Sequence, residues 1–168
     1  MTEKRTAIVF GGSSGIGEAT ARVLAEQGAD VTIVGRDASK LATAASGMRG
    51  VKTAVADALD ARAVEAAFEK AGAVDDVVIC VSGGKGAGAF KELDLADVAE
   101  AFRQKTLAQL TIAQVAARRM RTGTITFVTA ASPRSVIRGT AGLAAVNGAI
   151  EQLVPILALE LAPVRVNA

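Results

Sequence analysis

Short apolar blocks alternate with longer blocks of helical pattern along the whole chain. Five apolar blocks have the length and content of buried parallel strands, at residues 6–10, 31–34, 51–56, 77–81 and 123–129. Helical spacing of apolar residues predicts helices at residues 18–28, 39–47, 61–71, 94–121 and 143–161. This alternation predicts an α/β fold with a doubly wound parallel sheet. No repeat or linker divides residues 1–168, so we expect one domain.

The two longest predicted helices carry further expectations. Residues 94–121 are expected to form one helical stretch, with or without a break. Residues 143–161 are apolar around most of the helix, which favours burial on all sides. Pro155 should kink this helix or mark an irregular turn. We expect no segment to cross a membrane, because none approaches an uninterrupted apolar span.

Composition narrows the classes of function. The formal net charge of +2 is too small for a nucleic-acid-binding protein that lacks a basic run or an aromatic ladder. Cys80, the single cysteine, lies in an apolar block and is interpreted as a reduced core residue, so we expect a cytoplasmic protein. We expect no secretory signal, because the first apolar block ends at Gly11. With no histidine in the chain, we expect no metal site.

A glycine-rich turn joins the first strand to the first helix, at Gly11-Gly12-Ser13-Ser14-Gly15-Ile16-Gly17. A tight strand-to-helix turn needs residues without a Cβ atom, and it lets a phosphate approach the backbone. The helix N-terminus supplies N–H groups and a partial positive charge for a pyrophosphate. The turn therefore predicts a dinucleotide site, with these contacts: Gly11, Ser13, Ser14, Gly15, Ile16 and Gly17.

The end of the second strand indicates which dinucleotide binds. In nicotinamide-binding folds an acidic residue at this point holds the ribose diol, whereas a small residue followed by Arg leaves room and charge for a 2′-phosphate. The chain has Gly35 followed by Arg36, whose planar cation suits a phosphate or the adenine. We therefore predict NADP rather than NAD, although Asp37 keeps NAD open as the alternative.

The wide glycine spacing in GGSSGIG resembles that of the short-chain dehydrogenase/reductase (SDR) family. The resemblance runs along the chain, and Asp57-Ala58-Leu59-Asp60 is similar to the family's acidic turn after its third strand. Residues 160–168 resemble the start of its sixth strand. The resemblance implies a Rossmann fold and hydride transfer at a nicotinamide. Family members continue further, so we expect the C-terminal strand and the substrate lid to be missing from this chain.

The same resemblance implies further cofactor contacts. Asp57, with Ala58 beside it, would contact the adenine, and its carboxylate would accept a hydrogen bond from the adenine amino group. Asp60 is explained as the N-cap of the next helix. The alternative that both aspartates serve only as helix caps remains open. Gly35 stands where NAD-preferring members carry Asp. Cys80-Val81-Ser82-Gly83 replaces the family's Asn-Asn-Ala-Gly, so Ser82 and Gly83 keep the backbone approach to the cofactor and both amide side chains are lost.

The resemblance fails at the catalytic residues. The family's Ser, Tyr and Lys fall on Ala130, Leu143 and Asn147, its Asn falls near Lys105, and the chain contains no tyrosine. A phenol of pKa near 10 needs a neighbouring cation to exchange protons at neutral pH, so the usual acid–base group is absent. The catalytic residues therefore stay unknown, with weak candidates in Thr129, Ser132 and Asn147. Further candidates are Ser135, Lys85 and Lys105, and, for an anionic substrate, Arg134 and Arg138.

Three hypotheses for the function remain at this point. The first is an NADP-dependent oxidoreductase acting on a small carbonyl or alcohol through a non-standard proton donor. The second is a catalytically silent NADP(H)-binding sensor or regulatory protein, and the third is a structural partner that binds no nucleotide. The resemblance also implies a homodimer or homotetramer assembled through the two long helices.

Overall fold

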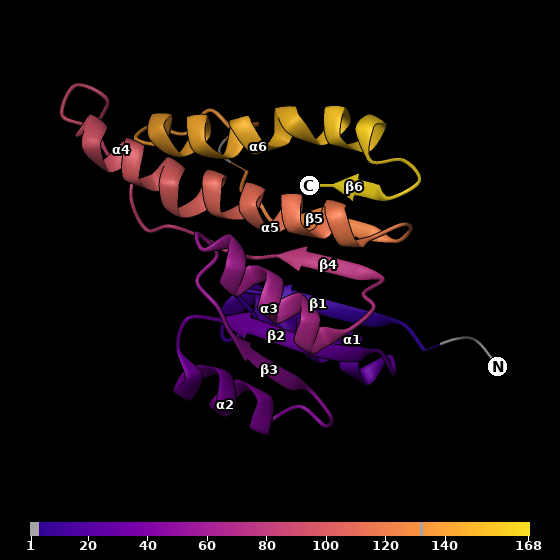
Figure 1. The fold of residues 1–168 in the computed structure, drawn as a ribbon. Coiled ribbons are helices and arrows are strands. Elements are labelled where there is room, and N and C mark those ends of the chain that lie inside the picture. The colour runs from indigo at the N-terminus through magenta and orange to yellow at the C-terminus, as the bar shows by residue number, and fades with distance from the viewer. Residues whose placement is uncertain (1–3, 132) are drawn as a thin grey trace.

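The fold is a parallel six-stranded sheet with helices on both faces. The computed structural model describes residues 4–131 and 133–168, and the strand order is β3–β2–β1–β4–β5–β6 (Figure 1). The strands are β1 Thr6–Phe10, β2 Asp30–Gly35, β3 Lys52–Val55, β4 Asp76–Ile79, β5 Thr124–Phe127 and β6 Arg165–Asn167. This architecture confirms the predicted doubly wound α/β fold, and it includes a short sixth strand paired with β5.

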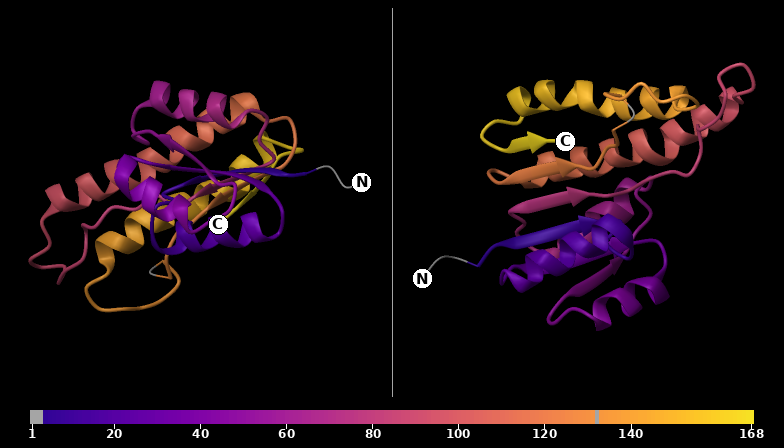
Figure 2. Two further views of the ribbon diagram at one scale, coloured as in Figure 1. Left: turned by 90° about the horizontal axis from the view of Figure 1, so that it is seen from below. Right: turned by 180° about the vertical axis from the view of Figure 1, so that it is seen from behind.

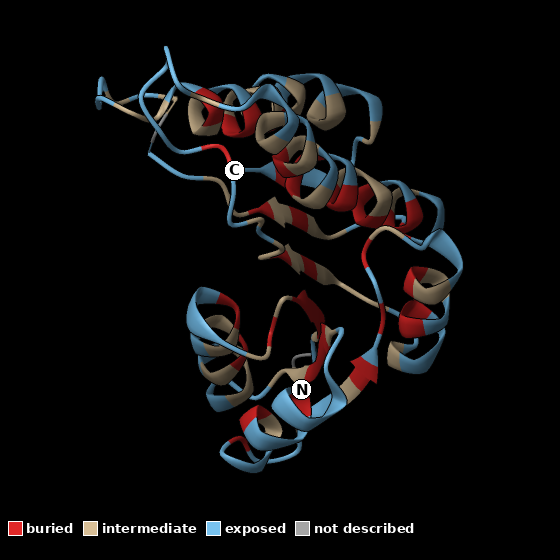
Figure 3. Ribbon diagram, turned by 90° about the vertical axis from the view of Figure 1, so that its left-hand side faces the viewer, coloured by how far each residue is buried: buried red, intermediate tan, exposed pale blue. Residues whose placement is uncertain are grey.

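The helices form two layers around the sheet (Figure 2). One face is covered by α1 Gly15–Glu26 and α2 Ala38–Ser46, and the other by α3 Ala61–Ala71, α5 Ala108–Arg119 and α6 Ala141–Glu160. Successive strand residues point to opposite faces, so Val9 packs in the first layer and Phe10 in the second. Figure 3 shows the buried residues in the strands and on the inward sides of the helices.

The long stretch predicted over residues 94–121 is continuous, but its geometry changes in the middle. It consists of α4 Leu95–Ala101, a π-helical turn η1 Phe102–Leu107, and α5. Asp94 caps α4 by accepting a hydrogen bond from the Ala96 amide at 2.8 Å. A π turn holds more residues per turn than an α-helix and occurs often at functional sites. The sequence pattern could not locate this turn.

Helix α6 runs through Pro155 and differs from its prediction in its burial. Its outer face is exposed, with Leu159 81% accessible, rather than buried on all sides. The helix is also long and apolar enough to cross a membrane by length and composition alone, with a mean hydropathy of 1.5. This corrects the expectation that no segment has that character. In this fold α6 packs against β6, η1 and α4.

The sheet has its switch point between β1 and β4. From β1 the chain moves outward through β2 and β3, and from β4 it moves outward the other way through β5 and β6. Ligands of open α/β sheets bind at such a point, outside the carboxyl ends of the strands. Strands β4 and β5 end earlier than predicted, and the residues that follow them, 80–82 and 128–129, line a cleft there.

Candidate functional site

A cleft of about 470 Å³ opens at the carboxyl ends of the strands. Its lining includes most of the cofactor residues predicted from the sequence: Gly11, Ser13, Ser14, Ile16, Gly17, Arg36, Asp57, Ala58 and Ser82. Gly15 and Gly83 are not in the lining. Gly15 faces open space, whereas a Cβ atom at Gly83 would lie 3.2 Å from the Cβ of Gln104. The cleft thus brings together segments that are far apart in the sequence.

The glycine turn is packed too closely for side chains at its critical positions. The Gly11 and Gly12 amides donate to the Val34 carbonyl at 2.8 and 3.3 Å, which ties the turn to the end of β2. Gly11 has a φ of 78°, and a Cβ atom at Gly17 would collide with the Gly11 carbonyl. Ser14 precedes α1 without a side-chain capping bond, so its hydroxyl does not cover the first-turn N–H groups. This backbone cradle fits a phosphate.

The end of β2 provides both space and positive charge. A Cβ atom at Gly35 would lie 3.5 Å from the Ser13 hydroxyl oxygen, so this hydroxyl borders the space beside the glycine. Arg36 lines the same part of the cleft. The Asp37 carboxylate turns instead to α2, where Oδ1 accepts from the amides of Ser39 and Lys40 at 2.9 and 3.1 Å. Asp37 therefore serves as a helix cap.

Two aspartates follow β3, and they have different contacts. Asp57 lines the cleft, and its Oδ1 accepts from the Leu59 amide at 3.0 Å in a local turn. Asp60 caps α3 by accepting from the amides of Arg62 and Ala63 at 2.9 and 3.3 Å. The prediction that Asp60 is an N-cap is confirmed. Only Asp57 of the pair faces the cleft.

Comparison with known proteins identifies the family. The family model for short chain dehydrogenases matches residues 5–168, nearly the whole chain. The chain belongs to the short-chain dehydrogenase family. Membership implies a nicotinamide cofactor, NAD or NADP, and the glycine cradle described above fits the phosphates of either.

Similar proteins include both named enzymes and solved structures. An L-xylulose reductase of Mesocricetus auratus is 31% identical over 174 residues, which cover 98% of this chain and 69% of that protein. An uncharacterized oxidoreductase of Mycobacterium tuberculosis is 53% identical over 64 residues, which cover 38% of this chain and only 25% of that protein. A short-chain dehydrogenase/reductase structure from Mycobacterium ulcerans has a TM-score of 0.89 at 29% identity, covering 98% of this chain and 66% of that one. The chain therefore spans only part of these relatives.

The half of the cleft above β4 and β5 in this short-chain dehydrogenase holds a buried lysine. Lys105 lies in η1, is only 8% exposed and lines the cleft, as Cys80 does at the end of β4. Burial lowers the pKa of Lys105 below its ordinary value, and the nearby Cys80 opposes this shift weakly. Burial also raises the pKa of the Cys80 thiol to about 11. Cys80 is therefore a protonated group at the cleft and only partly buried, which corrects its assignment to the core.

Gln109 fixes the position of this helix on the sheet. Its Nε2 donates to the carbonyls of Val81 and Val128, at 2.8 and 3.2 Å, which are the residues where β4 and β5 lead into the cleft. Lys105 precedes Gln109 by four residues, so both side chains belong to the same side of the helical run. The lysine is thereby held beside the ends of β4 and β5.

The other catalytic candidates from the sequence are mostly engaged elsewhere. Thr129 lines the cleft, and its hydroxyl donates to Glu151 Oε1 at 3.1 Å. Arg134 donates to the other Glu151 oxygen at 3.0 Å, so its charge is paired. Asn147 is buried and donates to the Leu143 carbonyl at 2.8 Å within α6. Ser132 lies outside the described residues, and the remaining candidates lie outside the cleft lining: Lys85, Ser135 and Arg138.

Three residues at the site were missed by the sequence reasoning. Arg103 and Gln104 line the cleft from η1, and Glu151 reaches Thr129 from α6. Glu151 is the only acidic residue of α6 before its last residue, Glu160, and that signal could have found it. Nothing in the spacing marks Arg103 or Gln104. Within the described residues, no group of three or more His, Cys, Asp or Glu side chains is placed to hold a metal ion.

Proposed function

We propose that this protein is a cytoplasmic, NADP(H)-dependent oxidoreductase that interconverts a small carbonyl compound and its alcohol. The observation that carries the choice of cofactor is the end of β2, where Gly35 has no side chain, the Ser13 hydroxyl lies beside it and Arg36 also lines the cleft. A 2′-phosphate requires a cation and hydrogen-bond donors in a place free of negative charge. The acidic residue that would favour NAD, Asp37, is occupied by capping α2.

We propose Lys105 as the proton donor. A bound NADPH would supply the hydride for the carbonyl carbon, and Lys105 would supply the proton that the carbonyl oxygen needs. Lys105 is a buried cation in the half of the cleft above β4 and β5, and among the described residues no carboxylate lies within ion-pair distance of it. An acid works best when its pKa lies near the working pH, and burial moves this lysine in that direction.

Calorimetric titration with NADPH and NADH tests the cofactor assignment. We expect the wild type to bind NADPH more tightly, and Arg36→Ala to weaken NADPH binding about 10- to 100-fold, since a hydrogen bond to a charged group contributes about 1.5–3 kcal/mol. NADH binding should change little. Arg49→Ala, which removes an equally charged exposed residue away from the cleft, is the control. Equal binding of both nucleotides by the wild type would contradict the assignment.

A panel of carbonyl substrates then separates an enzyme from a sensor. NADPH oxidation that depends on an added carbonyl supports the enzyme. Tight NADPH binding with no turnover across the panel would overturn it in favour of the silent NADP(H)-binding protein. That alternative draws its support from the sequence positions Ala130, Leu143 and Asn147, none of which can exchange a proton as a Tyr–Lys pair does.

We also propose that the protein forms a homodimer or homotetramer through the long helices. A groove of about 640 Å³ between α5 and α6 is lined mainly by apolar residues, and Leu107 at its edge is 52% exposed. Leu107→Glu is expected to shift the sedimentation profile at micromolar concentration toward the monomer, because the new charge would be buried in the interface. Val136→Glu, at an exposed apolar residue outside these helices, should leave the profile unchanged. A monodisperse wild-type monomer would contradict the proposal.

A further inference from the structure

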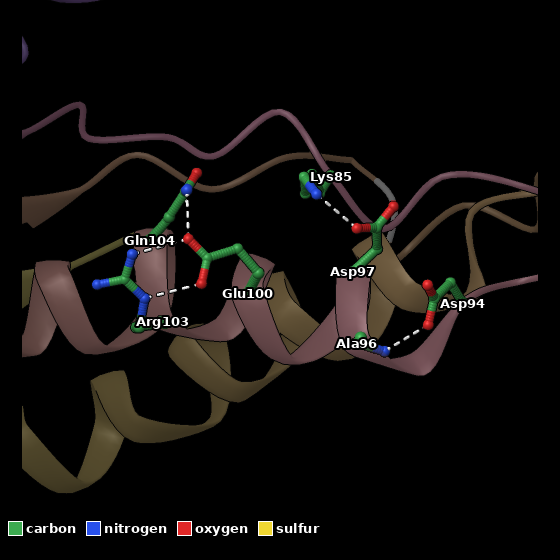
Figure 4. Close-up of polar contacts among 7 residues, drawn as sticks. All are labelled: Lys85, Asp94, Ala96, Asp97, Glu100, Arg103 and Gln104. Carbon is green, nitrogen blue, oxygen red and sulfur yellow. Dashed lines mark hydrogen bonds and ion pairs between the residues drawn. The ribbon is translucent and has the colours of Figure 1, made fainter.

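A carboxylate on α4 holds two cleft residues in place. Glu100 accepts from Arg103 through both oxygens, with Nε and Nη2 each at 2.8 Å, and also accepts from Gln104 Nε2 at 2.5 Å (Figure 4). Arg103 and Gln104 line the cleft, whereas Glu100 does not. These bonds lower the pKa of Glu100 to about 2, with Arg103 as the larger cause, so the carboxylate stays ionised at neutral pH. Arg103 is therefore oriented before any ligand arrives.

Arg103, in η1, and Asp57, after β3, line the same cleft. The charge of Arg103 interacts with Asp57, which adds to the larger effect of Glu100 in raising the pKa of Arg103. The same cleft is also lined by residues of the glycine turn that follows β1. The Arg103 side chain is about half exposed, and two of its five N–H donors are engaged by Glu100. Three donors remain for a ligand in the cleft.

We propose that Arg103, positioned by Glu100, binds the cofactor pyrophosphate together with the glycine turn. The inference rests on the proposed function, because it requires a dinucleotide in this cleft. A planar guanidinium matches two phosphate oxygens better than a lysine does. The pyrophosphate is common to NADP and NAD, so Arg103 contributes affinity to both cofactors, whereas Arg36 contributes the preference between them.

We assign Glu100 a positioning role, which predicts a measurable effect of Glu100→Gln on cofactor binding. Glu100→Gln keeps the charge of Arg103, but it removes one of the two charged hydrogen bonds between residues 100 and 103. The Arg103 side chain is then no longer held in one orientation. We expect a weaker effect than removal of Arg103 itself, about threefold on both cofactors, because preorganisation and not charge is lost. Tighter binding by Glu100→Gln would show that the carboxylate only neutralises Arg103, and would overturn the positioning role.

The test uses ligand fragments that separate the two phosphate sites. ADP-ribose carries the pyrophosphate without a 2′-phosphate, and adenosine 2′-monophosphate carries the 2′-phosphate without a pyrophosphate. Arg103→Met should weaken ADP-ribose binding about tenfold, the effect of one charged hydrogen bond, and leave adenosine 2′-monophosphate unchanged. Arg36→Ala should do the reverse. The control is Lys85→Met, since Lys85 forms an equally exposed ion pair with Asp97 at 2.6 Å, adjoining the same helix but outside the cleft (Figure 4).

The outcomes distinguish this inference from the proposed function. A folded Arg103→Met variant, checked by circular dichroism, that binds ADP-ribose like the wild type overturns the role of Arg103 and leaves the NADP assignment standing. Loss of adenosine 2′-monophosphate binding in that variant would move Arg103 to the 2′-phosphate, which also overturns the inference. A wild type that binds none of these nucleotides refutes both proposals.

Discussion

Lys105→Met is expected to lower the rate of carbonyl reduction at least ~100-fold and to leave the NADPH dissociation constant within about twofold. General acid catalysis typically contributes that factor or more, and methionine keeps much of the lysine volume without its proton. The measurement is single-turnover oxidation of bound NADPH by the best carbonyl of the panel. A variant that keeps more than half of the wild-type rate would assign the proton to water or to the Thr129–Glu151 pair.

The pH dependence of the rate has a defined sign. The donor must be protonated, so the reduction rate falls as pH rises through the pKa of Lys105, which lies below its ordinary value of 10.5. Alcohol oxidation needs the neutral amine, and its rate rises with pH through the same value. Its titratable neighbour Cys80, directly after β4, stays protonated to about pH 11 and does not add a step below that. Lys105→Arg keeps a cation that does not titrate, so its residual rate should lack this step.

Lys105 also gives a readout that does not depend on substrate. A lysine whose pKa is lowered in the folded state binds its proton less tightly there than in the unfolded chain, so stability rises with pH between the folded and unfolded pKa values. Below that window, the buried cation costs stability. Lys105→Met should therefore raise the melting temperature at pH values below the window, while it removes activity. A lower melting temperature would indicate that the lysine has a structural role instead.

The parts of the fold that follow from local pattern could be predicted from the sequence. The apolar strand blocks, the glycine turn and the capping role of Asp60 each depend on neighbours within a few residues, so periodicity and residue type suffice. The exposure of α6 did not follow, because an apolar helix at the edge of a sheet has the same composition as a buried one. That difference is set by what packs against the helix.

The residues of the candidate site also fall into two groups: those that local motifs predict and those that depend on contacts between distant segments. The residues of the glycine turn and Arg36 belong to contiguous motifs, and their meeting in one cleft follows from the parallel topology. Lys105 was one of several candidate cations in the sequence, and the spacing could not single it out, because it shows neither the π turn nor the burial of this lysine. The contact between Glu151 and Thr129 could not be predicted, because the two residues lie 22 positions apart in the chain. Contacts between distant segments need the assembled fold.

Gly35→Asp is expected to reverse the cofactor preference, and it is the strictest test of the NADP assignment. Gly35 is not one of the glycines with a positive φ. A Cβ atom added at this position would make ordinary contacts, 3.5 Å from both Leu41 Cδ2 and Ser13 Oγ. An aspartate therefore fits the backbone and brings its carboxylate to the place assigned to the 2′-phosphate. Repulsion of about 3 kcal/mol between like charges would weaken NADPH binding ~100-fold.

NADH binding should improve in the same variant, because the carboxylate can accept hydrogen bonds from the ribose diol. Gly35→Ala is the matched control, since it adds the Cβ atom without the charge and should keep the preference for NADPH. Calorimetry on the two variants separates crowding from charge at one position. If Gly35→Asp still prefers NADPH, the 2′-phosphate lies elsewhere and Arg36 is a solvent-exposed loop residue. If it prefers NADH, one residue at the end of β2 sets the choice of cofactor, and its effect on NADPH depends on the charge of the side chain and not on its size.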